Sequence, residues 1–152
     1  MQHFDDLIPE MKEWNDGRGI HVGDWLACYG NYELTVAYTS LFWPEFVIHD
    51  DCVFSAPFTE QHKESYKGFM KQTDGHKSSV EAVMNHQHIL DLFPNVEAEP
   101  TRDQVLHIGR ILRQMWQKKL NSDFPDREIT VSFPEEHCED LLDYEVTFFQ
   151  NH

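Results

Sequence analysis

The chain has 152 residues, of which 27 are Asp or Glu and 12 are Lys or Arg, so its formal net charge at pH 7 is -15. Hydrophobic residues make up 40% of the chain and aromatic residues 13%, which is enough to build a core and excludes an intrinsically disordered acidic protein. The charge opposes binding to nucleic acid and to anionic membranes, and it favours basic partners.

The negative charge is unevenly distributed. Residues 1–60 carry a net charge of -9 and residues 128–152 a net charge of -7, whereas residues 61–127 are nearly balanced at +1. No linker composition or internal repeat divides the chain, so we expect one domain over residues 1–152. The two acidic segments are the first places to look for a partner-binding surface.

The sequence also indicates a cellular compartment. The N-terminus has neither a basic region nor an apolar leader, and no run approaches the roughly 18 apolar residues of a membrane span. Cys28, Cys52 and Cys138 are widely spaced and lack the spacing of a zinc site or a disulfide framework. We therefore expect a cytoplasmic protein with reduced thiols and no membrane partner.

The first elements expected along the chain, up to about Trp43, are helices. A short helix is predicted over 7–14, followed by a glycine-rich turn. The next helix starts at Asp24 or Asn31, since both are good N-caps, and it should extend to about Trp43, where Pro44 stops it. Its apolar residues recur at helical spacing and therefore face a core.

A short β segment follows at residues 46–54. Two apolar runs flank the polar centre His49-Asp50-Asp51. This pattern predicts a strand, or a tight hairpin that turns at Asp50 and Asp51.

Three further helices are predicted, over 59–72, 78–93 and 102–121. Ser78 and Glu81 have the spacing of a capping box, in which a side chain at each position satisfies an exposed backbone amide of the first turn. Thr101 and Gln104 repeat that spacing ahead of the last helix.

The C-terminal region alternates apolar and polar residues over 128–133 and 144–149, which predicts two antiparallel strands. The fold class expected from these elements is α+β, with about four helices packed on a small antiparallel sheet that includes a C-terminal two-strand hairpin.

Two groups of side chains have the chemistry of a metal site. The first is His49, Asp50 and Asp51, although an Asp-Asp pair is equally good turn chemistry. The second is a stripe at helical spacing that comprises Glu81, Asn85 and His88, although a helix normally has such a solvated or hydrogen-bonded polar face. His86 and His88 would share a face on a strand but point apart on the predicted helix, which disfavours chelation by both.

The connection between the two C-terminal strands is the most concentrated acidic run of the chain. The residues proposed to contact a partner there are Glu135, Glu136, Glu139, Asp140 and Asp143. Such a loop is either solvated or a contact surface.

No motif indicates nucleophilic catalysis, so the sequence names no catalytic residue, leaves enzymatic activity uncertain and leans against it. The leading expectation is a non-enzymatic acidic interaction domain, such as an inhibitor, immunity-like protein or adaptor, that binds a basic protein and needs no cofactor. The alternative is a small metal-binding or metal-dependent enzyme domain that holds a divalent metal through His, Asp and Glu side chains.

Overall fold

The computed structural model describes residues 3–152 and has an α+β fold. The chain divides into two compact units, one ending at Thr39 and one running from Ser40 to His152. The single domain expected over 1–152 stays a prediction.

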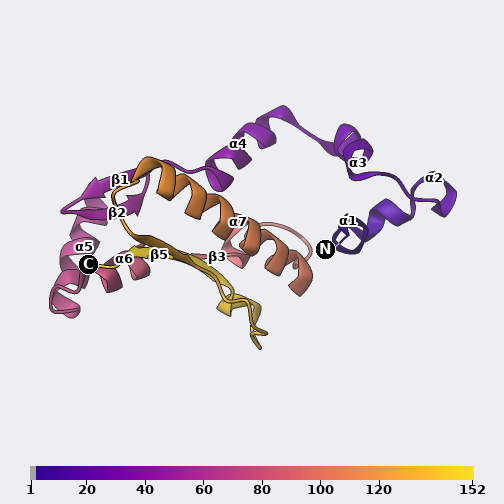
Figure 1. Cartoon of the computed structure of the whole chain (residues 1–152). Coiled ribbons are helices and arrows are strands. Elements are labelled where there is room, and N and C mark those ends of the chain that lie inside the picture. Colours follow the sequence, from indigo (N-terminus) through magenta and orange to yellow (C-terminus); the bar gives the residue numbers. More distant parts are fainter. Residues whose placement is uncertain (1–2) are drawn as a thin grey trace. The chain divides into compact units, whose positions relative to one another are not determined.

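The first unit consists of short helical segments (Figure 1). They are α1 (Phe4–Leu7), the 3-10 helix η1 (Pro9–Lys12), α2 (Trp14–Gly17), α3 (Val22–Tyr29) and the start of α4 (Tyr32–Phe42). The continuous helix predicted over 7–14 is therefore wrong. Ile8 has a non-helical conformation with φ of -129° and ψ of 76°, which ends α1, and Pro9 then begins a separate 3-10 turn.

Two helices replace the single helix predicted up to Trp43. Gly30 separates them, and a Cβ atom there would lie only 2.4 Å from the carbonyl oxygen of Leu26, so this close approach requires glycine. The Asn31 side chain accepts a hydrogen bond from the amide of Leu34 and caps α4. Of the two predicted helix starts, Asp24 and Asn31, the second is therefore confirmed. Helix α4 ends at Phe42, two residues before Pro44.

The second unit opens with the predicted hairpin. Strands β1 (Phe46–His49) and β2 (Cys52–Ser55) pair antiparallel, with His49 opposite Cys52. Asp50 and Asp51 both have positive φ angles, 48° and 67°, which gives the turn the twist that a two-residue hairpin needs. The hairpin prediction is confirmed.

Three helices follow: α5 (Glu60–Gln72), α6 (Lys77–Met84) and α7 (Arg102–Asp123). Thr59 caps α5, and Thr101 and Gln104 form the predicted capping box of α7. The helix predicted over 78–93 is wrong at both ends. His76 is its N-cap, Ser78 donates instead to the carbonyl of Gln150, and the helix stops at Met84.

The sheet of the second unit has three antiparallel strands in the order β3–β5–β4. They are β3 (Gln87–His88), β4 (Ile129–Ser132) and β5 (Glu145–Gln150), with the 3-10 helices η2 (Leu90–Leu92) and η3 (Leu141–Asp143) in the loops. The two predicted C-terminal strands are confirmed, whereas β3 lies where a helix was expected.

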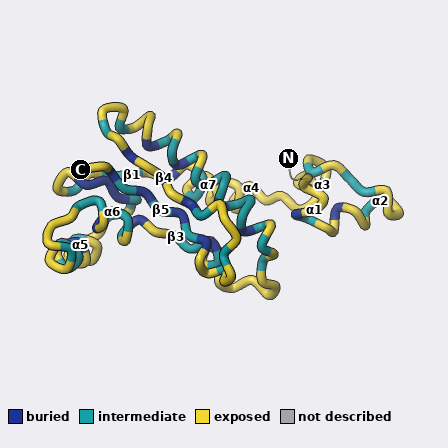
Figure 2. The backbone as a smooth tube through the Cα atoms, turned by 60° about the horizontal axis from the view of Figure 1, so that its bottom comes forward, coloured by how far each residue is buried: buried dark blue, intermediate teal, exposed yellow. Residues whose placement is uncertain are grey.

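The core lies between α7 and this sheet. Figure 1 shows α7 running along β5, and Figure 2 shows buried positions on both elements. Val146 and Phe148 of β5 contact the same buried cluster as Leu112 and Trp116 of α7. Among the residues described, no helix has the length and apolar content that a membrane span requires.

Candidate functional site

The polar stripe predicted on one helix is split by the structure. Glu81 and Asn85 lie on the inner face at the end of α6 and are buried, whereas His88 lies on β3 because the helix stops at Met84. The helical spacing that grouped these three residues therefore does not reach His88.

Glu81 and Asn85 connect the β1–β2 hairpin to the three-stranded sheet. The Asn85 amide nitrogen donates to the carbonyls of Val53 and Phe148, and its oxygen accepts from the amide of Ser55. Glu81 accepts from the amides of Val53 and Gln150, each at 2.7 Å. Two side chains thus satisfy strand-edge groups that would otherwise be buried without a partner.

The Glu81 carboxylate is fully engaged. Besides the two amides it accepts from Gln150 Nε2 at 2.6 Å, and His152 Nε2 lies 3.2 Å from its other oxygen. Cys52 lies within the same cluster, where burial raises the pKa of its thiol to about 11. The Glu81 carboxylate is thus occupied by protein donors, and metal binding through Glu81, Asn85 and His88 stays a prediction.

The hairpin turn also has its own protein partners. Asp50 accepts from the Tyr66 hydroxyl at 2.6 Å, and its backbone carbonyl accepts from Lys77. Asp51 forms an ion pair with Arg127 at 2.8 Å, and hydrogen bonding to that guanidinium lowers the pKa of the Asp51 carboxyl.

His49, the third member of the predicted turn site, packs its ring on Phe58 and Tyr66. Burial, followed by the hydrogen bond to Asp50, raises the pKa of the Tyr66 hydroxyl, which is therefore a proton donor to Asp50. Each of the three predicted ligands is thus engaged with different neighbours, and metal binding at His49, Asp50 and Asp51 stays a prediction.

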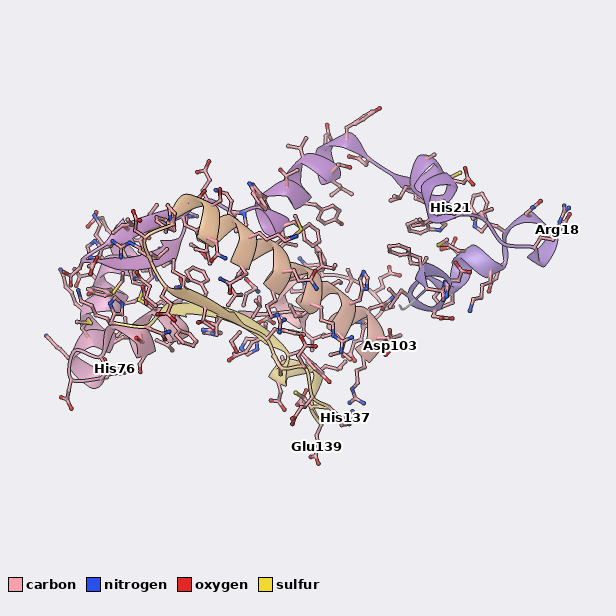
Figure 3. The ribbon with its side chains drawn as sticks, in the orientation of Figure 1. Arg18, His21, His76, Asp103, His137 and Glu139 are labelled. Carbon is pink, nitrogen blue, oxygen red and sulfur yellow. The ribbon has the colours of Figure 1, made fainter. Side chains whose placement is uncertain are left out.

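The acidic loop before β5 is partly neutralised. Glu135 forms ion pairs with Arg110 and Arg113 of α7, both at 2.9 Å. Arg102 donates to the backbone carbonyls of Cys138 and Glu139, which fastens the loop to the start of α7. Figure 3 shows Glu139 at the tip of this loop, with its side chain pointing away from the strands.

Part of the same loop lines a pocket of about 860 Å³, which we call the acidic pocket. Its lining residues are Leu90, Asp91, Pro94, Glu99, Glu139, Asp140, Leu141 and Leu142. Four carboxylates and four apolar residues thus share one concave surface, and among the residues that the structure describes no Lys, Arg or His lines it. Next to the pocket, Ile89 donates a backbone hydrogen bond to the carbonyl of Tyr144 and so joins the two segments that line it.

Of the five predicted partner contacts, Glu139 and Asp140 line the acidic pocket. Glu136 and Asp143 are exposed beside them in the loop, and Glu135 is occupied by the two arginines. Asp91 and Glu99 were missed by sequence reasoning because they belong to a distant segment without a motif of its own.

A third cluster was also missed. His86, His88 and Glu145 place their ligand atoms within 4.8 Å of one another on the β3–β5 strand pair. The available signal was the His-x-His pattern, which has the periodicity of a strand. The predicted helix over 78–93 disfavoured chelation by both histidines.

Comparison with known proteins gave no match to any family model, to any curated protein or to any solved structure.

Proposed function

We propose that the chain is a non-enzymatic interaction domain that binds a basic segment of a partner protein in the acidic pocket. The observation that carries the proposal is the lining of that pocket, in which four carboxylates lie beside four apolar residues without a cation. Lysine or arginine side chains of the partner would neutralise the carboxylates, while apolar side chains between them would cover the leucines and the proline.

The ion pairs of the second unit support this location. Arg110 and Arg113 neutralise Glu135, and Arg127 neutralises Asp51, so these acids have partners within the chain. The carboxylates of the acidic pocket keep their negative field, which speeds association with a basic segment and disfavours acidic competitors.

The cysteines support a reducing, cytoplasmic setting for this interaction. Cys28, Cys52 and Cys138 are all free, and Cys28 is exposed. An exposed unpaired thiol is compatible with a compartment that keeps thiols reduced.

The proposal is tested with a short peptide of alternating Lys and Leu residues, labelled with a fluorophore and titrated with the full chain. The triple variant Asp91→Asn, Glu99→Gln, Glu139→Gln removes three pocket charges. Asp140 is left intact because it accepts from the amide of Leu142 and shapes the loop. Since each exposed ion pair contributes up to about 1 kcal/mol, the affinity should fall roughly tenfold or more.

The matched control removes three nearby charges that do not line the pocket, in the variant Glu97→Gln, Glu136→Gln, Asp143→Asn. This variant has the same net charge as the first, so it should keep most of the affinity. Equal losses in the two variants would show binding to the general negative field and would contradict a specific pocket. A peptide with Glu in place of Lys should not bind.

A further inference from the structure

The register of β3 and β5 brings three metal-ligand side chains to one face of the sheet. His88 lies directly opposite Glu145 in the antiparallel pair. His86 lies just before β3, and its ligand atom lies within 4.8 Å of those of His88 and Glu145. The rings of His86 and His88 meet edge to face, with centroids 5.2 Å apart. The strand pairing therefore assembles a His-His-Glu group from two segments distant in sequence.

Backbone carbonyls fix which nitrogen of each imidazole is available. His86 Nδ1 lies 2.5 Å from the carbonyl of Val83, and His88 Nδ1 lies 2.7 Å from the carbonyl of Leu142. A carbonyl oxygen can only accept, so each Nδ1 carries the hydrogen. In the neutral ring the lone pair is then on Nε2, which is the arrangement found around protein-bound metals, where the second nitrogen donates to a carbonyl or carboxylate.

The spacing of the remaining atoms fits a shared cation. His88 Nε2 and Glu145 Oε2 are 3.7 Å apart, too far for a hydrogen bond. Two ligands bound tetrahedrally to Zn²⁺, with metal–ligand distances of about 2.0–2.2 Å, are separated by roughly 3.4 Å. The observed gap thus needs to close by only a few tenths of an ångström. Without a cation, the neutral imidazole would present its lone pair to a carboxylate.

A second pocket adjoins the cluster. It measures about 410 Å³ and is lined by Ser79, Ala82, Val83, His86, Glu145 and Thr147. Three protein ligands beside an open hollow leave a coordination position for water or a small ligand, which distinguishes such a site from a closed structural zinc site.

We infer that His86, His88 and Glu145 form a binding site for a first-row divalent metal ion, with Zn²⁺ as the expected occupant. Two imidazoles and one carboxylate suit a borderline ion of this class better than Mg²⁺ or Ca²⁺, which prefer oxygen ligands. The site is separate from the acidic pocket in its lining residues, and it does not depend on the function proposed for that pocket.

The competing cluster is Cys52, Glu81 and His152. The Glu81 carboxylate already accepts hydrogen bonds from three amide donors. The Glu145 carboxylate, in contrast, has one polar contact among the described residues, the 3.7 Å contact to His88. The remaining competitor for the His-His-Glu group is a proton, which would pair His88 with Glu145 but would leave His86 uninvolved.

The test is calorimetric titration of the full chain with ZnCl₂, together with nitrogen-detected NMR of the imidazoles. We expect one Zn²⁺ per chain and a shift of the Nε2 resonances of both His86 and His88, with the Nδ1 hydrogens retained. His86→Gln and His88→Gln should each weaken binding about tenfold or more, as should Glu145→Gln. His137→Gln, an exposed histidine outside the cluster, should bind like the wild type.

Three results would overturn the inference: no Zn²⁺ binding by the wild type, loss of binding in Cys52→Ala with retention in His86→Gln, or Nε2 shifts confined to His88. The first excludes a site, the second moves it to the other cluster, and the third shows that His86 is not a ligand. The NMR measurement uses the wild-type chain, so the test stands even if a variant does not fold.

Discussion

The buried Glu81 carboxylate accepts backbone hydrogen bonds that a neighbouring strand would otherwise accept. Its side chain is 0% exposed, and its oxygens accept hydrogen bonds from the amides of Val53 on β2 and Gln150 on β5. A buried charge is costly unless donors surround it, and here the strand edges supply them. The carboxylate therefore holds the β1–β2 hairpin and the three-stranded sheet in register with α6.

Replacing this carboxylate by an amide should destabilise the protein. In Glu81→Gln, the new NH₂ group must face an amide donor of Val53 or Gln150, so one strand group loses its acceptor. We expect a loss of roughly 3 kcal/mol in the free energy of unfolding, measured by urea denaturation. The exposed Glu97→Gln should change stability little, and equal stability of both variants would contradict the role given to Glu81.

Asp51 links stability to acidic pH through Arg127. The guanidinium lowers the pKa of the folded Asp51 carboxyl below its ordinary value of 3.8. Since the folded pKa is the lower one, the ion pair stabilises the protein above pH 3.8 and is lost as the pH falls through the folded pKa.

The variant Asp51→Asn should therefore be less stable than the wild type near neutral pH, and this difference should shrink as the pH falls below 3.8. Urea midpoints measured across this range check the expectation. A constant difference between Asp51→Asn and wild type would refute the linkage.

Helix α7 packs closely against the loop after β4 because Gly109 has no Cβ atom. A Cβ atom at Gly109 would lie 2.1 Å from the ring of Phe133, which is itself buried. The helix approaches Phe133 this closely because position 109 has no side chain. Gly68 in α5 has nothing within 4 Å of the same added atom.

These two glycines give a matched pair of predictions. Gly68→Ala should stabilise the protein by about 0.5–1 kcal/mol, because alanine is the better helix former. Gly109→Ala should destabilise it by about 1–3 kcal/mol, because overpacking against Phe133 outweighs the gain in helix propensity. Thermal or urea unfolding of both variants distinguishes the effects, and stabilisation by Gly109→Ala would show that the ring moves aside freely.

Local signals predicted several elements correctly. The Asp50-Asp51 turn and the capping residues Thr59 and Thr101 are local features, and alternation alone gave β4 and β5. These elements are correct because their determining interactions lie within a few residues of one another.

The end of α6 could not be predicted in this way. Val80 and Ile89 continue an apolar pattern that favours a helix, but the helix stops where Asn85 bonds to β2 and β5. Tertiary hydrogen bonds thus override local propensity. The two-residue strand β3 is too short for its His-x-His periodicity to outweigh that helical pattern, so neither the pairing of His88 with Glu145 nor the part of the acidic pocket formed by residues 90–99 could be predicted from the sequence.

Some acidic side chains from the two acidic segments of the sequence form ion pairs in the second unit. Cations from the balanced middle of the chain bind acids of the two acidic segments: Arg127 binds Asp51, and Arg110 and Arg113 bind Glu135. The acidic pocket around Glu139 is the surface that we propose for a partner. Because exposed charges are screened by salt, binding there should weaken as ionic strength rises.

The most direct measurement is an amide chemical-shift map of the full chain titrated with the Lys-Leu peptide. If the basic segment binds in the acidic pocket, saturable shifts should occur at residues 90–99 and 139–142, the two segments that line it. Shifts spread over the acidic residues of 1–60, or no saturable shifts at all, would contradict a specific basic-partner site in that pocket.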